Sequence, residues 1–155
     1  MDQSAEGMRM SSLFEDLYNQ EPWLDVTIVS KLNSLTASKA AARLLDNCNT
    51  IWEIVNHMIN WRENVLKRVN GEVLKTPKNN YFKEIMDTSD KAWIKTLEAL
   101  QQSQQAWMLY LETITEDDLA KVYAPNQMNY YKHIHGILQH DAYHLGQIVL
   151  LLKFV

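Results

Sequence analysis

The sequence contains little cysteine, glycine or proline and has no long hydrophobic run. Its single cysteine, Cys48, excludes an internal disulfide and is typical of a protein from a reducing compartment. Only four glycines and three prolines occur in 155 residues, which favours long helices joined by few turns. The amino-terminal stretch lacks the apolar segment of a secretory signal, and the longest apolar run, residues 148–152, is far too short to span a membrane. We therefore expect a cytoplasmic protein that does not enter the membrane.

The balance of charges argues against one class of partner. Lysine and arginine together number 15 against 19 acidic residues, so the net charge is −4 at pH 7, and the basic residues form no cluster or stripe. Nucleic acid is therefore not expected as a partner. With 46% hydrophobic and 22% charged residues, the composition is that of an ordinary folded protein. The length fits one domain that spans residues 1–155.

Hydrophobic periodicity predicts four substantial helices. Apolar side chains recur at helical spacing within residues 8–18, 51–69, 90–114 and 127–154. The third of these has the clearest pattern, a seam of apolar positions three and four residues apart that only Gln104 interrupts. Shorter helical pieces are expected within residues 23–35, 37–45 and 115–123. Four helices with inward-facing seams make an all-α helix bundle.

Local signals mark several helix ends and one long connector. Thr50 and Glu53 have the spacing of a capping box at the start of the second long helix, and Gly71 follows its expected end. Asn126 is expected to cap the final helix. Residues 72–89 form a long connector, and about 18 extended residues reach roughly 60 Å, against about 30 Å for a helix of about 20 residues. The two helices that it joins could therefore run parallel to each other.

Two histidines four residues apart, His140 and His144, mark the final helix as the functional element. Side chains at this spacing lie on one face, about 6 Å apart along the axis, and the apolar residues around them place the pair inside the bundle. His57 lies on the apolar face of the second long helix and is the expected third member. Three imidazoles suit a divalent ion such as Zn²⁺ or Ni²⁺ and leave a position for water or substrate. The alternative is three core histidines hydrogen-bonded to backbone carbonyls or waters.

Two further polar residues near the pair allow more than one interpretation. Asp141 gives the helix a pattern similar to the H-E-x-x-H motif of zinc proteases. However, aspartate is one carbon shorter than glutamate and lies about 100° around the helix from the histidines, which disfavours a protease. We expect Asp141 to face solvent or to contact a metal ligand from outside the site. Gln147, one turn beyond His144, could orient a ligand or bridge helices, and no catalytic base is identifiable.

Three segments carry motifs whose order and spacing along the chain are distinctive. They are YNQEPW at residues 18–23, WEIVNHMINW at 52–61 and GILQHDAYHLGQ at 136–147. With these motifs the chain resembles the DinB superfamily, and within it the YfiT-like branch, from about residue 11 to residue 152. The resemblance implies a four-helix bundle with up-down-down-up order. It also implies a divalent metal ion, Zn²⁺ or Ni²⁺, held by His57, His140 and His144, and a cytoplasmic homodimer.

The resemblance further implies chemistry with small thiols. Some members of this superfamily are enzymes that use low-molecular-weight thiols such as bacillithiol or mycothiol. Our first hypothesis is therefore a metal-dependent enzyme that activates a small thiol for attack on a small electrophile, as an S-transferase does, or activates water, as a hydrolase does. The alternatives are a metal-binding, stress-related bundle protein without turnover, and a bundle with structural histidines that acts through a dimer interface. An open coordination position beside a pocket would favour the first hypothesis.

Overall fold

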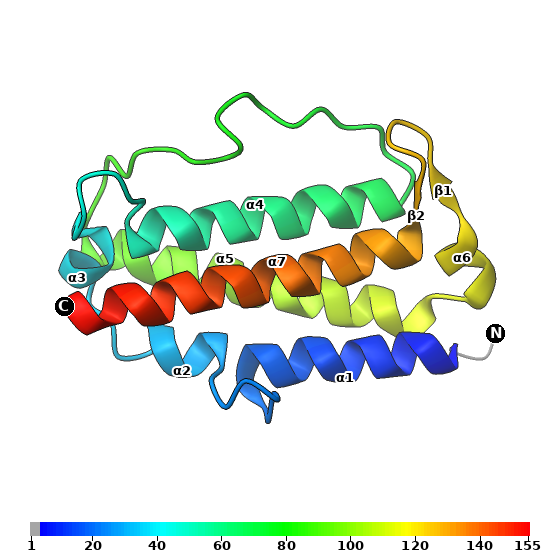
Figure 1. Cartoon of the computed structure of the whole chain (residues 1–155), viewed down its shortest axis with the longest axis horizontal. Coiled ribbons are helices and arrows are strands. Elements are labelled where there is room, and N and C mark those ends of the chain that lie inside the picture. Colours follow the sequence, from blue (N-terminus) through cyan, green and yellow to red (C-terminus); the bar gives the residue numbers. More distant parts are fainter. Residues whose placement is uncertain (1–3) are drawn as a thin grey trace.

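Four long helices form the bundle that the sequence predicts. The computed structural model describes residues 4–155, and its main helices are α1 (Ala5–Asn19), α4 (Ile51–Val69), α5 (Asp90–Thr113) and α7 (Tyr130–Leu151). Figure 1 shows α1 and α7 running in one direction and α4 and α5 in the other. This arrangement confirms the all-α fold with up-down-down-up order. No helix in the part of the chain that the structure describes is long and apolar enough to cross a membrane.

Short elements lie at the two ends of the bundle. The helices α2 (Ile28–Leu32) and α3 (Ala37–Ala41) occupy one end, and α6 (Glu116–Ala120) and an antiparallel hairpin of β1 (Val122–Tyr123) and β2 (Met128–Asn129) occupy the other (Figure 1). A 3-10 helix, η1 (Leu152–Phe154), follows α7. The helical piece expected within residues 23–35 is confirmed only at 28–32, since the chain before it is irregular and leaves Trp23 98% exposed.

The start of the final helix differs from the prediction. Asn126, the expected cap, lies in the hairpin turn, where the next residue, Gln127, has a φ of 59°. Asn129 caps α7 instead, and its side-chain oxygen accepts a hydrogen bond from the backbone N–H of Lys132 at 2.9 Å. Either asparagine is able to cap a helix. The hairpin places Asn126 in its turn and Asn129 at the start of α7, so Asn129 is the cap. The hairpin was not predictable, because two-residue strands are too short to produce a periodic signal in the sequence.

The helix α4 begins and ends at the residues that the sequence indicates. The hydroxyl of Thr50 accepts from the backbone N–H of Glu53 at 3.1 Å, and the Glu53 carboxylate accepts from the backbone N–H of Thr50 at 2.7 Å. This is the predicted capping box. At the other end Gly71 adopts a φ of 95°, which favours glycine. The connector that follows runs back along the bundle without a helix (Figure 1), and α4 and α5 are therefore parallel.

The core consists of two apolar clusters with a polar layer between them. On α4 the buried members of one cluster end at Ile59 and those of the other begin at Val65. On α5 the corresponding residues are Leu100 and Trp107. Buried polar side chains fill the level between the clusters, and they include Arg62, Ser103, Gln104 and Asp141. Because buried polar groups are costly without partners, this layer and the histidines beside it are where function is expected.

Candidate metal centre

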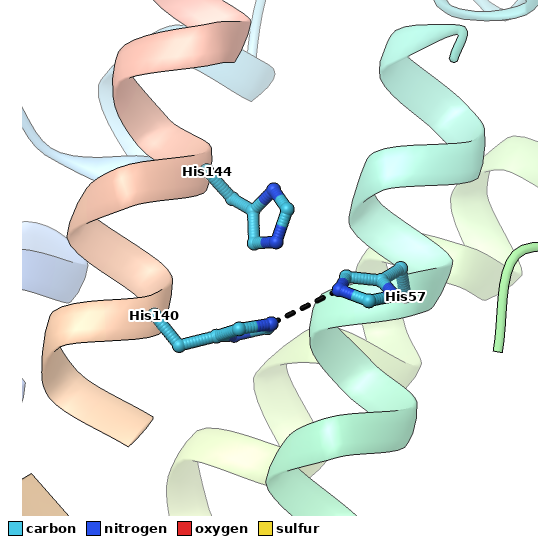
Figure 2. Close-up of side chains that lie close together, drawn as sticks. All are labelled: His57, His140 and His144. Carbon is cyan, nitrogen blue, oxygen red and sulfur yellow. Dashed lines mark hydrogen bonds between the residues drawn. The ribbon is translucent and has the colours of Figure 1, made fainter. Parts of the chain in front are cut away.

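Three histidines from two helices meet inside the bundle. Figure 2 shows the side chain of His57, on α4, facing those of His140 and His144, on α7. One nitrogen from each ring lies within 4.8 Å of the others, and the Nε2 atoms of His57 and His140 are 3.0 Å apart. We refer to these residues as the three-histidine cluster. In residues 4–155, no other group of three or more His, Cys, Asp or Glu side chains is placed to hold a metal ion.

Hydrogen bonds orient two of the three rings. Nδ1 of His57 lies 2.7 Å from the backbone carbonyl oxygen of Asn80. A carbonyl only accepts, so Nδ1 carries the proton and Nε2 keeps a free lone pair. Nδ1 of His144 lies 2.7 Å from the side-chain oxygen of Gln147, with the same consequence. Gln147 therefore orients His144, which is one of the two roles that its sequence position allowed.

The nitrogen geometry fits a divalent metal ion. Zn²⁺ binds imidazole nitrogen at about 2.0–2.1 Å, so two ligands of a tetrahedral ion lie roughly 3.3 Å apart. The 3.0 Å between the Nε2 atoms of His57 and His140 is close to that separation. Without an ion, one of these nitrogens must carry a proton and donate it to the other. The same arrangement thus serves as a hydrogen-bonded histidine pair or as part of a metal site.

Burial keeps two of the imidazoles neutral. The side chains of His57 and His144 are among the buried polar groups of the core. Burial is the largest influence on His57 and lowers its pKa from 6.5 to about 4, although the hydrogen bond to Asn80 opposes the shift. Burial, and then the neighbouring His140, lowers the pKa of His144. At neutral pH both rings are uncharged, which is the form of histidine that binds metal ions.

The connector between α4 and α5 covers the cluster. Phe82 stacks on the ring of His57, with the centroids 3.9 Å apart and the planes at 7°. Trp61 lies 6.0 Å from the ring of His140, and its Nε1 donates to the side-chain oxygen of Asn80 at 3.0 Å. Sequence patterns did not predict that Asn80 and Phe82 are parts of the site. They belong to a stretch without periodicity, and Asn80 approaches His57 from 23 residues away in the chain.

The covering segment has unusual backbone geometry. Asn80 and Tyr81 have φ angles of 50° and 64°, in the left-handed region that residues with a β-carbon seldom adopt. Asparagine tolerates this conformation better than most residues, whereas tyrosine does not. Asn64, on α4, holds the segment in place by donating to the hydroxyl of Tyr81 at 2.6 Å. Two asparagines after Pro77 are a turn signal in the sequence, but they do not reveal that the turn lies over the cluster.

Asp141 is fully buried, so of the two positions expected for it the solvent-facing one is wrong. Its Oδ2 accepts from Nε of Arg62 at 2.7 Å, and the two side chains are 0% and 1% exposed. The reason is that the bundle encloses α7 on more than one side, so a position about 100° from the histidines is still interior. Arg62 occupies Oδ2 of this carboxylate, which also argues against the zinc-protease interpretation, because that role needs a carboxylate free to accept a proton from water. Gln104 belongs to the same group, since it accepts from Nη2 of Arg62 at 2.9 Å.

Two features connect the cluster with its surroundings. The side chain of His140 is 23% exposed, so this ring offers the most direct access from solvent. A cavity of about 280 Å³ has Gln147, the hydrogen-bond partner of His144, in its lining, which includes none of the three histidines. Most of its lining is apolar, and the residues that form it are Leu45, Asn47, Cys48, Asn49, Ile54, Gln147, Leu150 and Leu151. A small apolar group fits such a space.

Comparison with known proteins identifies the family. Residues 10–148 match the family model of the DinB superfamily. The match covers most of the chain and includes His57, His140 and His144. No curated protein and no solved structure matches the chain. The arrangement of the four helices and the extent of the family match lead to the same conclusion, that this chain belongs to the DinB superfamily.

Proposed function

We propose that this protein is a divalent-metal-dependent enzyme that transfers a small thiol to an electrophilic carbon. The observation that carries the proposal is the three-histidine cluster. No fourth His, Cys, Asp or Glu joins the cluster from the described part of the chain. Three protein ligands and an open position are typical of catalytic metal sites, whereas structural sites are closed by four. The open position is the place that we assign to the thiol.

The donor set favours Zn²⁺ or Ni²⁺ as the ion. Neutral imidazoles suit both metals, and the low pKa of His57 keeps its nitrogen available at neutral pH. His57, His140 and His144 would hold the ion, and Asn80 and Gln147 would keep two of the rings aimed at it. When bound, such an ion lowers the pKa of a coordinated thiol and supplies a thiolate at neutral pH.

The surroundings of the cluster support reaction with a small electrophile. The partly exposed side chain of His140 gives the thiol a route from solvent. The apolar cavity beside Gln147 is suited to the carbon portion of the electrophile. In the reaction, the thiol sulfur forms a bond to carbon, the leaving group departs with its electron pair, and the thiol proton passes to solvent. Phe82 and Trp61 shield the cluster from bulk water, which strengthens the electrostatic interactions inside it.

A bimane assay tests the proposal. Zinc-loaded and nickel-loaded protein is mixed with bacillithiol, mycothiol or cysteine and with monobromobimane, and the fluorescent thioether is followed over time. We expect turnover above the uncatalysed rate for the wild type and for His135→Ala, a histidine variant on α7 outside the cluster. We expect none for His144→Ala. Stoichiometric metal without turnover, and without hydrolysis of an activated ester, would contradict the proposal and favour a non-catalytic metal-binding protein.

A further inference from the structure

The polar layer beside the cluster contains an arginine with all three of its nitrogens engaged. Nε of Arg62 donates to Oδ2 of Asp141 at 2.7 Å, Nη1 donates to the hydroxyl of Ser103 at 3.2 Å, and Nη2 donates to Oε1 of Gln104 at 2.9 Å. Residues from two other helices, α5 and α7, thus hold Arg62, and through it the carboxylate of Asp141, in one orientation. This network uses only one of the two carboxylate oxygens.

Two buried atoms next to each other lack hydrogen-bond partners. They are Oδ1 of Asp141 and Nδ1 of His140, and they lie 3.6 Å apart. A buried carboxylate oxygen without a partner is costly, so an unpaired oxygen in this position calls for an explanation. The other two histidines of the cluster each have an acceptor at Nδ1, namely the Asn80 carbonyl and the Gln147 amide. Only His140 lacks one.

We infer that Asp141 is the positioning residue of His140, and that its Oδ1 accepts the Nδ1 proton when Nε2 of His140 binds a metal ion. The inference rests on the proposed metal site. A neutral imidazole that uses Nε2 as a ligand carries its proton on Nδ1, and metal-bound histidines commonly donate that proton to a carboxylate or carbonyl. Asp141 completes the set of three Nδ1 acceptors. Arg62 prevents the carboxylate from turning away.

A purely structural role for Asp141 makes a different prediction. In that case the carboxylate only balances the charge of Arg62, and the affinity for a metal ion does not depend on Oδ1. Asp141→Asn separates the two roles. The amide oxygen would accept from Arg62, and the amide NH₂ would then donate toward Nδ1 of His140. That contact favours the tautomer with the proton on Nε2, which is the nitrogen needed for the metal ion.

The test measures Zn²⁺ affinity by competition with a chromophoric chelator. We expect Asp141→Asn to bind about 10- to 100-fold more weakly than the wild type. The matched control is Ser103→Ala, which removes one contact of Arg62 but leaves Asp141 in place, and we expect its affinity to stay close to that of the wild type. Proton NMR of the zinc-loaded wild type should show a low-field His140 Nδ1–H resonance that Asp141→Asn lacks. If Asp141→Asn does not fold, the double variant Arg62→Gln with Asp141→Asn, which pairs two neutral amides, replaces it with the same expectation.

The outcomes separate this inference from the proposed activity. Folded Asp141→Asn with wild-type zinc affinity would overturn the inference and leave Asp141 as the counter-ion of Arg62. Weaker zinc binding by Asp141→Asn supports the inference even if the bimane assay shows no thiol transfer. A wild type that binds no zinc would overturn the inference together with the metal site.

Discussion

His57 and His140 face each other between α4 and α7 with their Nε2 atoms 3.0 Å apart, although 83 residues separate them in the sequence. His57 uses Nδ1 to donate to Asn80, so its Nε2 is an acceptor. His140 must therefore either donate a proton to it or share a metal ion with it. The choice between these two states determines whether the bundle holds a metal ion.

Gln147→Leu removes the acceptor of the His144 Nδ1 proton and leaves all three proposed metal ligands in the chain. We expect Zn²⁺ affinity to fall about 10-fold or more, because the ring loses the contact that fixes its tautomer and orientation. Chelator competition measures the change. Gln139→Leu is the matched control, since Gln139 is exposed on the same helix, and its affinity should not change. Equal affinities for the two variants would contradict the role assigned to Gln147.

The metal-free protein should lose stability as the pH falls from 6.5 to 4. Burial lowers the pKa of native His57 from 6.5 to about 4, so in this window the unfolded chain binds a proton at His57 that the native state does not. Above pH 6.5 the ring is neutral in both states and contributes no dependence on pH. Urea unfolding of wild type and His57→Gln across this range isolates the effect. The free energy of unfolding of the variant should depend less steeply on pH than that of the wild type. Identical slopes for the two proteins would contradict the lowered pKa of His57.

Arg62→Ala should be among the most destabilising single substitutions in the chain. It leaves the Asp141 carboxylate buried without its partner, which costs about 3–5 kcal/mol in the free energy of unfolding. The double variant Arg62→Met with Asp141→Leu removes both charges and should cost less. Arg9→Ala breaks an exposed ion pair with Glu6 and should change stability by less than about 1 kcal/mol. If urea denaturation shows that Arg62→Ala and Arg9→Ala lower the free energy of unfolding by similar amounts, the stabilising role of the buried pair is contradicted.

Features that local signals encode were predictable from the sequence. The capping box of Thr50 and Glu53 depends on residues three apart, and α4 begins where it indicates. The inward position of His140 and His144 follows from helical spacing among apolar neighbours, and His57 follows from the same reasoning on α4. The structure brings these three rings together. Their role as metal ligands stays a prediction, as does the homodimer.

Contacts between distant segments were not predictable. Asn80 and Phe82 reach the cluster through a connector whose path depends on left-handed residues and on contacts with α4. The burial of Arg62 was not predictable, because an arginine on a helix is usually able to extend its charged group to water. It is buried here because Asp141, Ser103 and Gln104, from two other helices, supply acceptors at the same level. The hairpin after α6 likewise forms by pairing and not by periodicity.

Metal content tests the central claim most directly. Protein purified without a histidine tag is analysed by elemental mass spectrometry for the wild type, His144→Ala and His135→Ala. We expect near-stoichiometric zinc or nickel in the wild type and in His135→Ala, and a sharp loss in His144→Ala. A wild type that contains no metal and takes up none at pH 8, where the imidazoles are neutral, would contradict the account. The three histidines would then be core residues linked by hydrogen bonds.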